Sequence, residues 1–223
     1  MLNWKYRNED HFEAYWYLLH NWAPRFRSAY SPGRSEYTAN MQWKTIKYSI
    51  CYRVDSLKHG FWECPMVNKI WLASVDLLKE MTGRPNIAQG ILWTWKEVLL
   101  GFPQTKRYLP KELRARLVLW HSTIIFLIWS RRRWAIKDIQ LDTLTGSPNF
   151  LEPLWATDLK SDLRKNVSRI FERYKVDGKL DAFRREWTSE TNLWVVKGIS
   201  LSFSASFDEL DLQFEVPLEL VMD

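Results

Sequence analysis

The chain has 223 residues, 46% of them hydrophobic, with 14 tryptophans and a formal net charge of +6. This length allows one domain with a buried core, and two cysteines are too few for a disulfide-stabilised fold. The start, MLNWKYRNEDHF, lacks the apolar core of a signal peptide, and no apolar run is long enough to span a bilayer. We therefore expect an intracellular protein, nuclear or cytoplasmic and not secreted, with no membrane partner.

The charge is unevenly distributed along the sequence. After Lys197 there is no lysine or arginine, but there are six acids: Asp208, Glu209, Asp211, Glu215, Glu219 and Asp223. The first 197 residues therefore hold all 32 basic residues and 20 of the 26 acids, a net charge of +12. A basic body attracts polyphosphates without sequence preference, although an ordinary solvated surface accounts for the same charges.

The first 50 residues predict a helix followed by a basic and aromatic segment. Apolar residues recur at helical spacing over residues 10–23, and Pro24 ends this helix. Residues 25–47 then interleave Arg and Lys with Tyr and Trp. Such a segment can hold phosphates while its aromatic rings stack on bases, or it is a loop whose aromatic side chains pack on the core.

Both cysteines lie in one stretch, CYRVDSLKHGFWECPMVNKIW, which covers residues 51–71. Cys51, His59 and Cys64 supply the thiolate and imidazole ligands that zinc prefers, but a structural site needs four ligands. Tyr48 stands where a Cys-x-x-Cys pair ending at Cys51 would begin. Judged on spacing alone, the alternative is two buried free cysteines and a surface histidine.

Three helices are predicted between Pro65 and Lys137. The first begins at Pro65 and ends at Gly83, and a shorter one covers roughly 88–100, followed by a polar linker to Pro110. The apolar stripe of the first helix is Val67, Ile70, Trp71, Val75 and Leu78. The third, Lys111 to about Lys137, is apolar most of the way round and is predicted to be the central buried helix.

Two features of the central helix have alternative interpretations. His121 lies on a mostly apolar stretch, where a histidine with a hydrogen-bond partner in the core is more common than a ligand or a base. Arg131, Arg132 and Arg133 lie near the end of the helix, where cations suit its macrodipole. The same three arginines could instead face phosphates.

The last third of the chain predicts a loop, two helices and a small sheet. After a loop at 140–153, a basic amphipathic helix covers about 156–176, and a short helix follows Gly178. The basic residues of the longer helix lie off its apolar side: Lys160, Arg164, Lys165, Arg169 and Arg173. Alternation in LWVVKGISLSFSASF and LDLQFEV predicts two or three antiparallel strands, the last with acids on one face. Those acids could protect a sheet edge, or fold back on the basic body and compete with nucleic acid.

The stretch around the cysteines resembles the zinc-binding region that follows the polymerase domain in reverse transcriptases of LINE-type (non-LTR) retrotransposons. The residues that carry the resemblance are Cys51, His59, Cys64, Pro65 and Trp71, with Tyr48 in place of the first cysteine. AYWYLLHNWAPRFRSAYS, LVLWHSTIIFLIWSRRR and FRREWTSETNLWVVKG are similar to flanking segments of that family. The resemblance implies zinc, which we expect to be bound weakly or lost because one ligand is missing.

The resemblance also implies a nucleic-acid-binding accessory role, with non-specific RNA or DNA as the partner, in a truncated or relic copy that has no polymerase. The Tyr-x-Asp-Asp motif and the hydrolase and phosphate-loop motifs are absent from the sequence, so we expect no enzymatic activity. The residues predicted to contact phosphates or bases are Arg25, Arg27, Lys44, Lys47, Arg53, Lys58, Arg131, Arg132, Arg133, Trp43 and Trp62. The alternative is a helical protein-interaction module that binds neither nucleic acid nor metal and whose protein partner is unknown.

The predicted fold is mainly α: an irregular helical domain with a long central helix and a short C-terminal antiparallel β hairpin or meander. Residues 1–190 form the helical domain, which contains the degenerate zinc knuckle at 48–71. Residues 191–223 form an acidic, β-rich segment that packs on the same domain.

Overall fold

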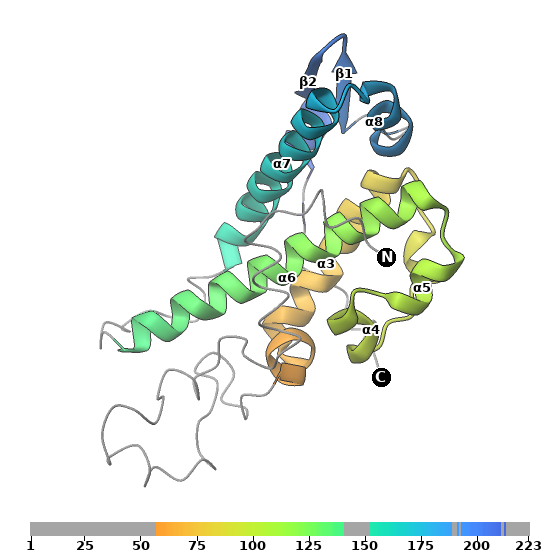
Figure 1. Cartoon of the computed structure of the whole chain (residues 1–223). Helices are drawn as coiled ribbons and strands as arrows, with labels where there is room; N and C mark the ends of the chain where they lie inside the picture. The colour runs from red at the N-terminus through yellow and green to blue at the C-terminus, as the bar shows by residue number, and fades with distance from the viewer. Residues whose placement is uncertain (1–56, 141–151, 189–190, 192, 211, 213–223) are drawn as a thin grey trace, which may run out of the picture.

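The computed structural model of this protein describes residues 57–140, 152–188, 191, 193–210 and 212. These residues are mainly helical, with a two-stranded antiparallel sheet near their C-terminal end, which confirms the predicted fold class (Figure 1). The features predicted at 10–23, 25–47 and 141–151, and in the tail from 213, lie outside the described residues. No helix within the described residues is long and apolar enough to cross a membrane.

The described chain begins with a short π-helical turn, η3 (His59–Glu63), followed by helix α3 (Pro65–Thr82). Pro65 starts the helix at a position where its missing N–H has no helical partner. Gly83 ends it in the left-handed conformation, with φ 65°. The buried apolar side chains of α3 are Val67, Ile70, Trp71, Ala73, Leu77, Leu78 and Met81. The predicted stripe is thus largely correct, except that Val75 is only partly buried.

The single helix predicted over 88–100 is wrong, because the chain divides there into two elements. A 3₁₀ turn, η4 (Ile87–Gly90), is followed by extended residues and then by helix α4 (Trp95–Leu100). Thr94 is extended and its hydroxyl accepts a hydrogen bond from the Glu97 amide at 3.2 Å, so it caps α4.

The polar linker predicted before Pro110 is also wrong, because it contains helix α5 (Pro103–Tyr108). The buried Glu97 carboxylate accepts hydrogen bonds from the amides of Gln104 at 3.1 Å and Thr105 at 3.4 Å. These amides belong to the first turn of α5 and have no partner within the helix. A carboxylate from α4 therefore supplies the N-terminal cap of α5.

Helix α6 (Lys111–Gln140) runs through the middle of the molecule and contacts α3, α7 and α8 (Figure 1). The indole of Trp120 donates a hydrogen bond to the Ser74 carbonyl of α3 at 2.7 Å. His121 is buried, its Nε2 donates to the Val98 carbonyl at 2.5 Å, and its ring stacks on Trp71. The prediction of a core histidine with a hydrogen-bond partner is confirmed.

A buried arginine joins α6 to the ends of two other helices. The side chain of Arg116 donates hydrogen bonds to the carbonyls of Met81 at 3.1 Å, Glu186 at 3.1 Å and Thr188 at 2.8 Å. Met81 lies in the last turn of α3 and Glu186 in the last turn of α8, where carbonyls lack helical partners. Burial lowers the pKa of the Arg116 guanidinium, and the charge of Glu112 opposes this shift. We call this arrangement the Arg116 clamp.

The C-terminal part of the fold consists of helix α7 (Glu152–Val176), helix α8 (Leu180–Trp187) and the hairpin of β1 (Trp194–Lys197) and β2 (Ser200–Phe203). The strands pair in the register Trp194 with Phe203 and Lys197 with Ser200, which leaves a two-residue turn. Gly198 is the first residue of this turn and has φ 59°, as a type II′ turn requires. The predicted hairpin is confirmed.

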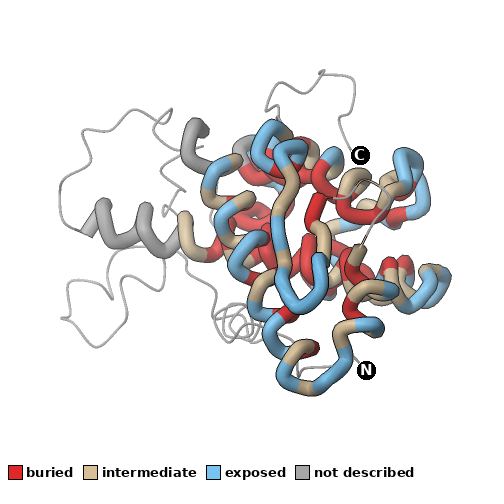
Figure 2. Tube along the Cα trace, turned by 90° about the horizontal axis from the view of Figure 1, so that it is seen from above, coloured by how far each residue is buried: buried red, intermediate tan, exposed pale blue. Residues whose placement is uncertain are grey.

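The strand predicted to continue through SASF is wrong, because helix α9 (Ala205–Glu209) stands there. The Ser204 hydroxyl accepts a hydrogen bond from the Phe207 amide at 3.3 Å and so caps α9. Phe207 is fully buried, and its ring lies 5.2 Å from that of Phe203. Buried residues gather where the helices meet, and exposed residues line their outer faces (Figure 2). Trp194 and Phe207 share one continuous core with α3 and α6.

Candidate nucleic-acid interface

Two of the predicted zinc ligands, His59 and Cys64, lie at the two ends of η3. Both side chains are buried, and the Cys64 amide donates to the His59 carbonyl at 2.8 Å, which closes the π-helical turn. The surface histidine of the alternative interpretation is therefore wrong. Cys51 and Tyr48 lie outside the described residues. Among the residues that are described, no group of three His, Cys, Asp or Glu side chains is placed to hold a metal ion. Zinc binding stays a prediction.

Two predicted nucleic-acid contacts also belong to η3 and its cap. The Lys58 ammonium is 2.5 Å from the Glu63 carboxylate, and about half of the side chain is covered. Trp62 is only 8% exposed and stacks on Trp93 at 6.5 Å between ring centroids, with 16° between the planes. The indole of Trp62 is thus largely covered within the described chain, and its role in base stacking stays a prediction.

The structure describes the side chain of one residue of the α6 arginine triplet, Arg131. Arg131 pairs with Asp158 of α7, and burial lowers the pKa of its guanidinium. Because α6 continues to Gln140, the triplet lies about two turns before the helix end, too far for the macrodipole explanation. The side chains of Arg132 and Arg133 lie outside the description, as do the residues Arg25, Arg27, Lys44, Lys47, Arg53 and Trp43.

The structure separates the five basic side chains predicted to lie off the apolar side of α7 into two groups, and a sixth basic residue, Lys175, pairs with Glu172. Lys165, Arg169 and Arg173 are exposed and follow one another at intervals of four residues, so they form one row on the outer face. Successive members are about 6 Å apart along the helix axis. No described residue forms an ion pair or hydrogen bond with any of the three. We call these residues the α7 row.

The second group, Lys160 and Arg164, is held by residues far along the chain. The Lys160 ammonium donates to the Asp208 carbonyl at 2.8 Å, and the Arg164 guanidinium pairs with the Asp208 carboxylate. The same guanidinium lies over the rings of Phe203 and Phe207, 5.1 and 5.3 Å from their centroids. The segment β2–α9 therefore binds Lys160 and Arg164 and leaves the α7 row exposed.

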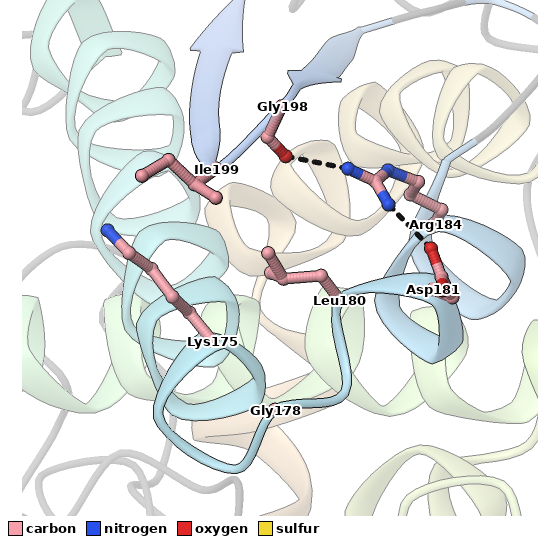
Figure 3. Close-up of a pocket in the computed structure, with 7 residues that line it drawn as sticks. All are labelled: Lys175, Gly178, Leu180, Asp181, Arg184, Gly198 and Ile199. Atoms are coloured by element: carbon pink, nitrogen blue, oxygen red, sulfur yellow. Dashed lines mark hydrogen bonds and ion pairs between the residues drawn. The ribbon is translucent and has the colours of Figure 1, made fainter.

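A hollow of about 380 Å³ lies between the end of α7, α8 and the hairpin turn (Figure 3). Arg184 donates hydrogen bonds to Asp181 and to the Gly198 carbonyl, both at 2.6 Å, and so fixes the turn to α8. Leu180 and Ile199 face the hollow, and Ile199 is 67% exposed. An open apolar surface next to fixed charges is a feature of protein-binding surfaces.

Comparison of the chain with protein-family models, curated proteins and solved structures finds no match. A functional assignment must therefore come from the residues themselves. In the part of the chain that the structure describes, the α7 row and the hollow beside the hairpin turn are two of the features that are open to a partner.

Proposed function

We propose that this protein is a nucleic-acid-binding accessory domain without catalytic activity, which holds RNA or DNA through the phosphate backbone. The observation that carries the proposal is the α7 row of three exposed cations without partners among the described residues. The net charge of +12 over residues 1–197 and the resemblance to the zinc-binding region of LINE-type reverse transcriptases support it. The proposal includes a zinc site at Cys51, His59 and Cys64 that is weak or lost.

The geometry of the α7 row suits a polyanion better than a single carboxylate. Three cations on one helix face extend over about 12 Å, so they can meet successive phosphates of one strand. The three side chains are not arranged to form hydrogen bonds with the edges of bases, which favours binding that is independent of sequence. Each phosphate contact releases counterions, so three contacts with a single strand contribute about −2 to the slope of log K against log salt.

The test is fluorescence anisotropy with a labelled single-stranded RNA and a labelled DNA duplex, from about 50 to about 200 mM salt. The variant Lys165→Gln, Arg169→Gln, Arg173→Gln removes the row. We expect its salt slope to be shallower by about 2 and its affinity at low salt to fall by about tenfold or more.

The matched control is Arg84→Gln, Lys96→Gln, Arg107→Gln, which removes the same charge from exposed cations of other elements. We expect this control to bind within about twofold of the unmodified protein, because the contacts are local. Equal weakening of the two variants would show that only the overall charge matters, and failure of the unmodified protein to bind at low salt would refute the function.

A protein-interaction module is the second candidate, and the exposed apolar residues near the hollow favour it. Ile199 lines the hollow and is 67% exposed, and Val176, which follows the lining residue Lys175 in the chain, is 82% exposed. The variant Ile199→Ser leaves the described core intact. If the native chain forms a protein complex that survives high salt and Ile199→Ser dissociates it, while RNA does not bind, this second function replaces the first.

A further inference from the structure

We propose that the hollow beside the hairpin turn is a docking site for an acidic peptide that carries an aliphatic side chain. The partner is thus a second protein with an exposed acidic segment. The inference goes beyond the proposed function, because it adds a protein partner of stated chemistry at a surface other than the α7 row. The volume of the hollow, its aliphatic side chains and the charges at its rim support it.

The hollow offers space and an apolar wall to an aliphatic side chain. Its volume of about 380 Å³ lies at the lower end of the range of ligand pockets, about 300–1,000 Å³. Leu180 at the start of α8 and the largely exposed Ile199 of the turn line it (Figure 3). Covering them removes apolar surface from water, which is favourable. None of the described residues that line the hollow is aromatic, so it suits an aliphatic side chain better than a nucleobase, which binds by stacking on aromatic rings.

The acids next to the hollow are already paired with cations. Asp181 accepts a hydrogen bond from Arg184 at 2.6 Å, and Arg184 also donates to the Gly198 carbonyl. The Asp177 carboxylate is 3.9 Å from the Lys179 ammonium. These contacts balance the two acidic charges, and they fix the wall of the hollow, so a partner orders few side chains when it binds.

Two lysines at the rim are available to the carboxylates of a partner. Lys175 lines the hollow, and its ammonium is 3.6 Å from the exposed Glu172 carboxylate, a surface pair that contributes little to stability. Lys197 directly precedes Gly198, is exposed, and forms no ion pair or side-chain hydrogen bond with any described residue. Acids on both sides of a docked aliphatic side chain can therefore pair with these two ammonium groups. The rim as a whole has a net charge of +1, from Lys175, Lys179, Arg184 and Lys197 against Glu172, Asp177 and Asp181.

The docking site and the α7 row lie on different sides of α7. Each residue of an α-helix turns about 100° around the axis, so Lys175 is about 200° from Arg173, the nearest member of the row. Arg169 and Lys165 lie about 9 and about 15 Å before Lys175 along the axis. A peptide and a nucleic acid can therefore bind at the same time. The chain would then join an acidic protein to nucleic acid, and this last step rests on the proposed function.

The first test needs no nucleic acid. It measures the fluorescence anisotropy of a short fluorescein-labelled peptide in which Leu and Glu alternate, added to the full chain. Two matched probes replace every Leu by Ser or every Glu by Gln. We expect each matched probe to bind at least about tenfold more weakly than the Leu–Glu peptide. Equal binding of all three probes, or no binding of the Leu–Glu peptide at low salt, would overturn the inference.

Variants of the protein separate the aliphatic contact from the charged one. Ile199→Ser should weaken binding of the Leu–Glu peptide about tenfold and leave its salt dependence unchanged. Lys175→Gln combined with Lys197→Gln should also weaken it about tenfold, and the remaining binding should depend less on salt. If neither variant weakens binding, the peptide binds elsewhere and the inference is wrong.

Matched controls exclude effects of overall charge and of exposed apolar area. Leu92→Ser removes another exposed aliphatic side chain, and Arg84→Gln combined with Lys96→Gln removes two exposed cations of other elements. We expect both controls to bind the Leu–Glu peptide within about twofold of the native chain, because the contacts are local. If the controls weaken binding as much as the variants at the hollow, the inference is wrong.

The failure of this inference is distinguishable from the failure of the proposed function. Replacing the α7 row by glutamines should leave peptide binding within about twofold, since the two surfaces are separate. If the peptide binds at the hollow but neither RNA nor DNA binds, the proposed function is wrong and the docking site stands. If the substitutions at Lys175 and Lys197 weaken RNA binding and not peptide binding, the hollow belongs to the nucleic-acid interface and the docking site is refuted.

Discussion

Replacing Arg116 should destabilise the protein more than replacing any exposed arginine. Its guanidinium donates to the carbonyls of Met81, Glu186 and Thr188, and the side chain is only 5% exposed. Arg116→Met keeps an unbranched apolar stem but removes all three donors. Two of the carbonyls that lose a donor lie in the last turns of α3 and α8, where no helical amide replaces it.

The magnitude follows from the number of hydrogen bonds. A buried acceptor left without a partner costs about 1–3 kcal/mol, and partial access of water at the Thr188 end reduces the sum. We therefore expect Arg116→Met to lower the free energy of unfolding by about 3–5 kcal/mol, a large part of the total for a domain of this size. Arg116→Lys keeps the charge but cannot reach all three carbonyls, so its loss should be intermediate.

The assay is urea unfolding followed by tryptophan fluorescence, with the slope m checked for constancy. The control is Arg114→Met, because Arg114 is exposed and its hydrogen bonds reach only the nearby carbonyls of Leu109 and Arg107. We expect the control to change stability by less than about 1 kcal/mol. A guanidinium stays protonated at all ordinary pH values, so the loss should be the same between about pH 5 and pH 9. Equal effects of the two substitutions would refute the role of the Arg116 clamp.

Substitutions at three further positions, Glu97, Gly198 and Tyr48, test local features of the chain. Glu97→Leu should lower the free energy of unfolding by about 2–3 kcal/mol, because the first-turn amides of α5 lose a buried carboxylate. Glu97→Gln should lower it less, because the side chain keeps one acceptor oxygen. Thermal unfolding of the two variants measures the difference. Gly198→Ala should cost about 1–2 kcal/mol through its φ of 59° alone, since a Cβ there meets no atom within 4 Å. Gly90→Ala, equally open but without a positive φ, should be near neutral and serves as its control. Tyr48→Cys should bind one zinc ion per chain and unfold at a higher temperature; metal analysis that finds no zinc in this variant would remove the support for a zinc knuckle.

The sequence predicted the elements whose signals are local. Helical spacing and terminal residues located α3, with Pro65 at its start and Gly83 at its end. Apolar residues on every side marked α6 as the central helix. The hairpin followed from alternation on both sides of Lys197 and Gly198.

The sequence failed where a distant residue decides the local structure. Helix α5 looked like a linker because its cap is the Glu97 carboxylate, which belongs to another helix. Helix α9 looked like a strand because SASF alternates, and the capping role of Ser204 outweighs that pattern. One signal was available: Thr94 followed three residues later by Glu97 has the spacing of a capping box, and it marks the start of α4.

The same distinction between local signals and distant contacts holds for the candidate nucleic-acid interface. The basic face of α7 was visible in the sequence, but all five of its cations looked equivalent. Asp208 follows Arg164 by 44 residues, so no local pattern could show that Arg164 is paired while Lys165 is open. The burial of Trp62 against Trp93 likewise depends on a contact between separate elements.

The end of α3 has a consequence for the order of folding during synthesis on the ribosome. The Glu80 carbonyl accepts a hydrogen bond from the Thr191 hydroxyl at 2.6 Å, which is 111 residues later in the chain. At about 5–20 residues per second, Thr191 is made roughly 6–22 s after Glu80. Until then α3 lacks this contact, although Arg116 can already bind the Met81 carbonyl in the same turn. The contacts at the C-terminal end of α3 are therefore complete only when almost 200 residues have been translated.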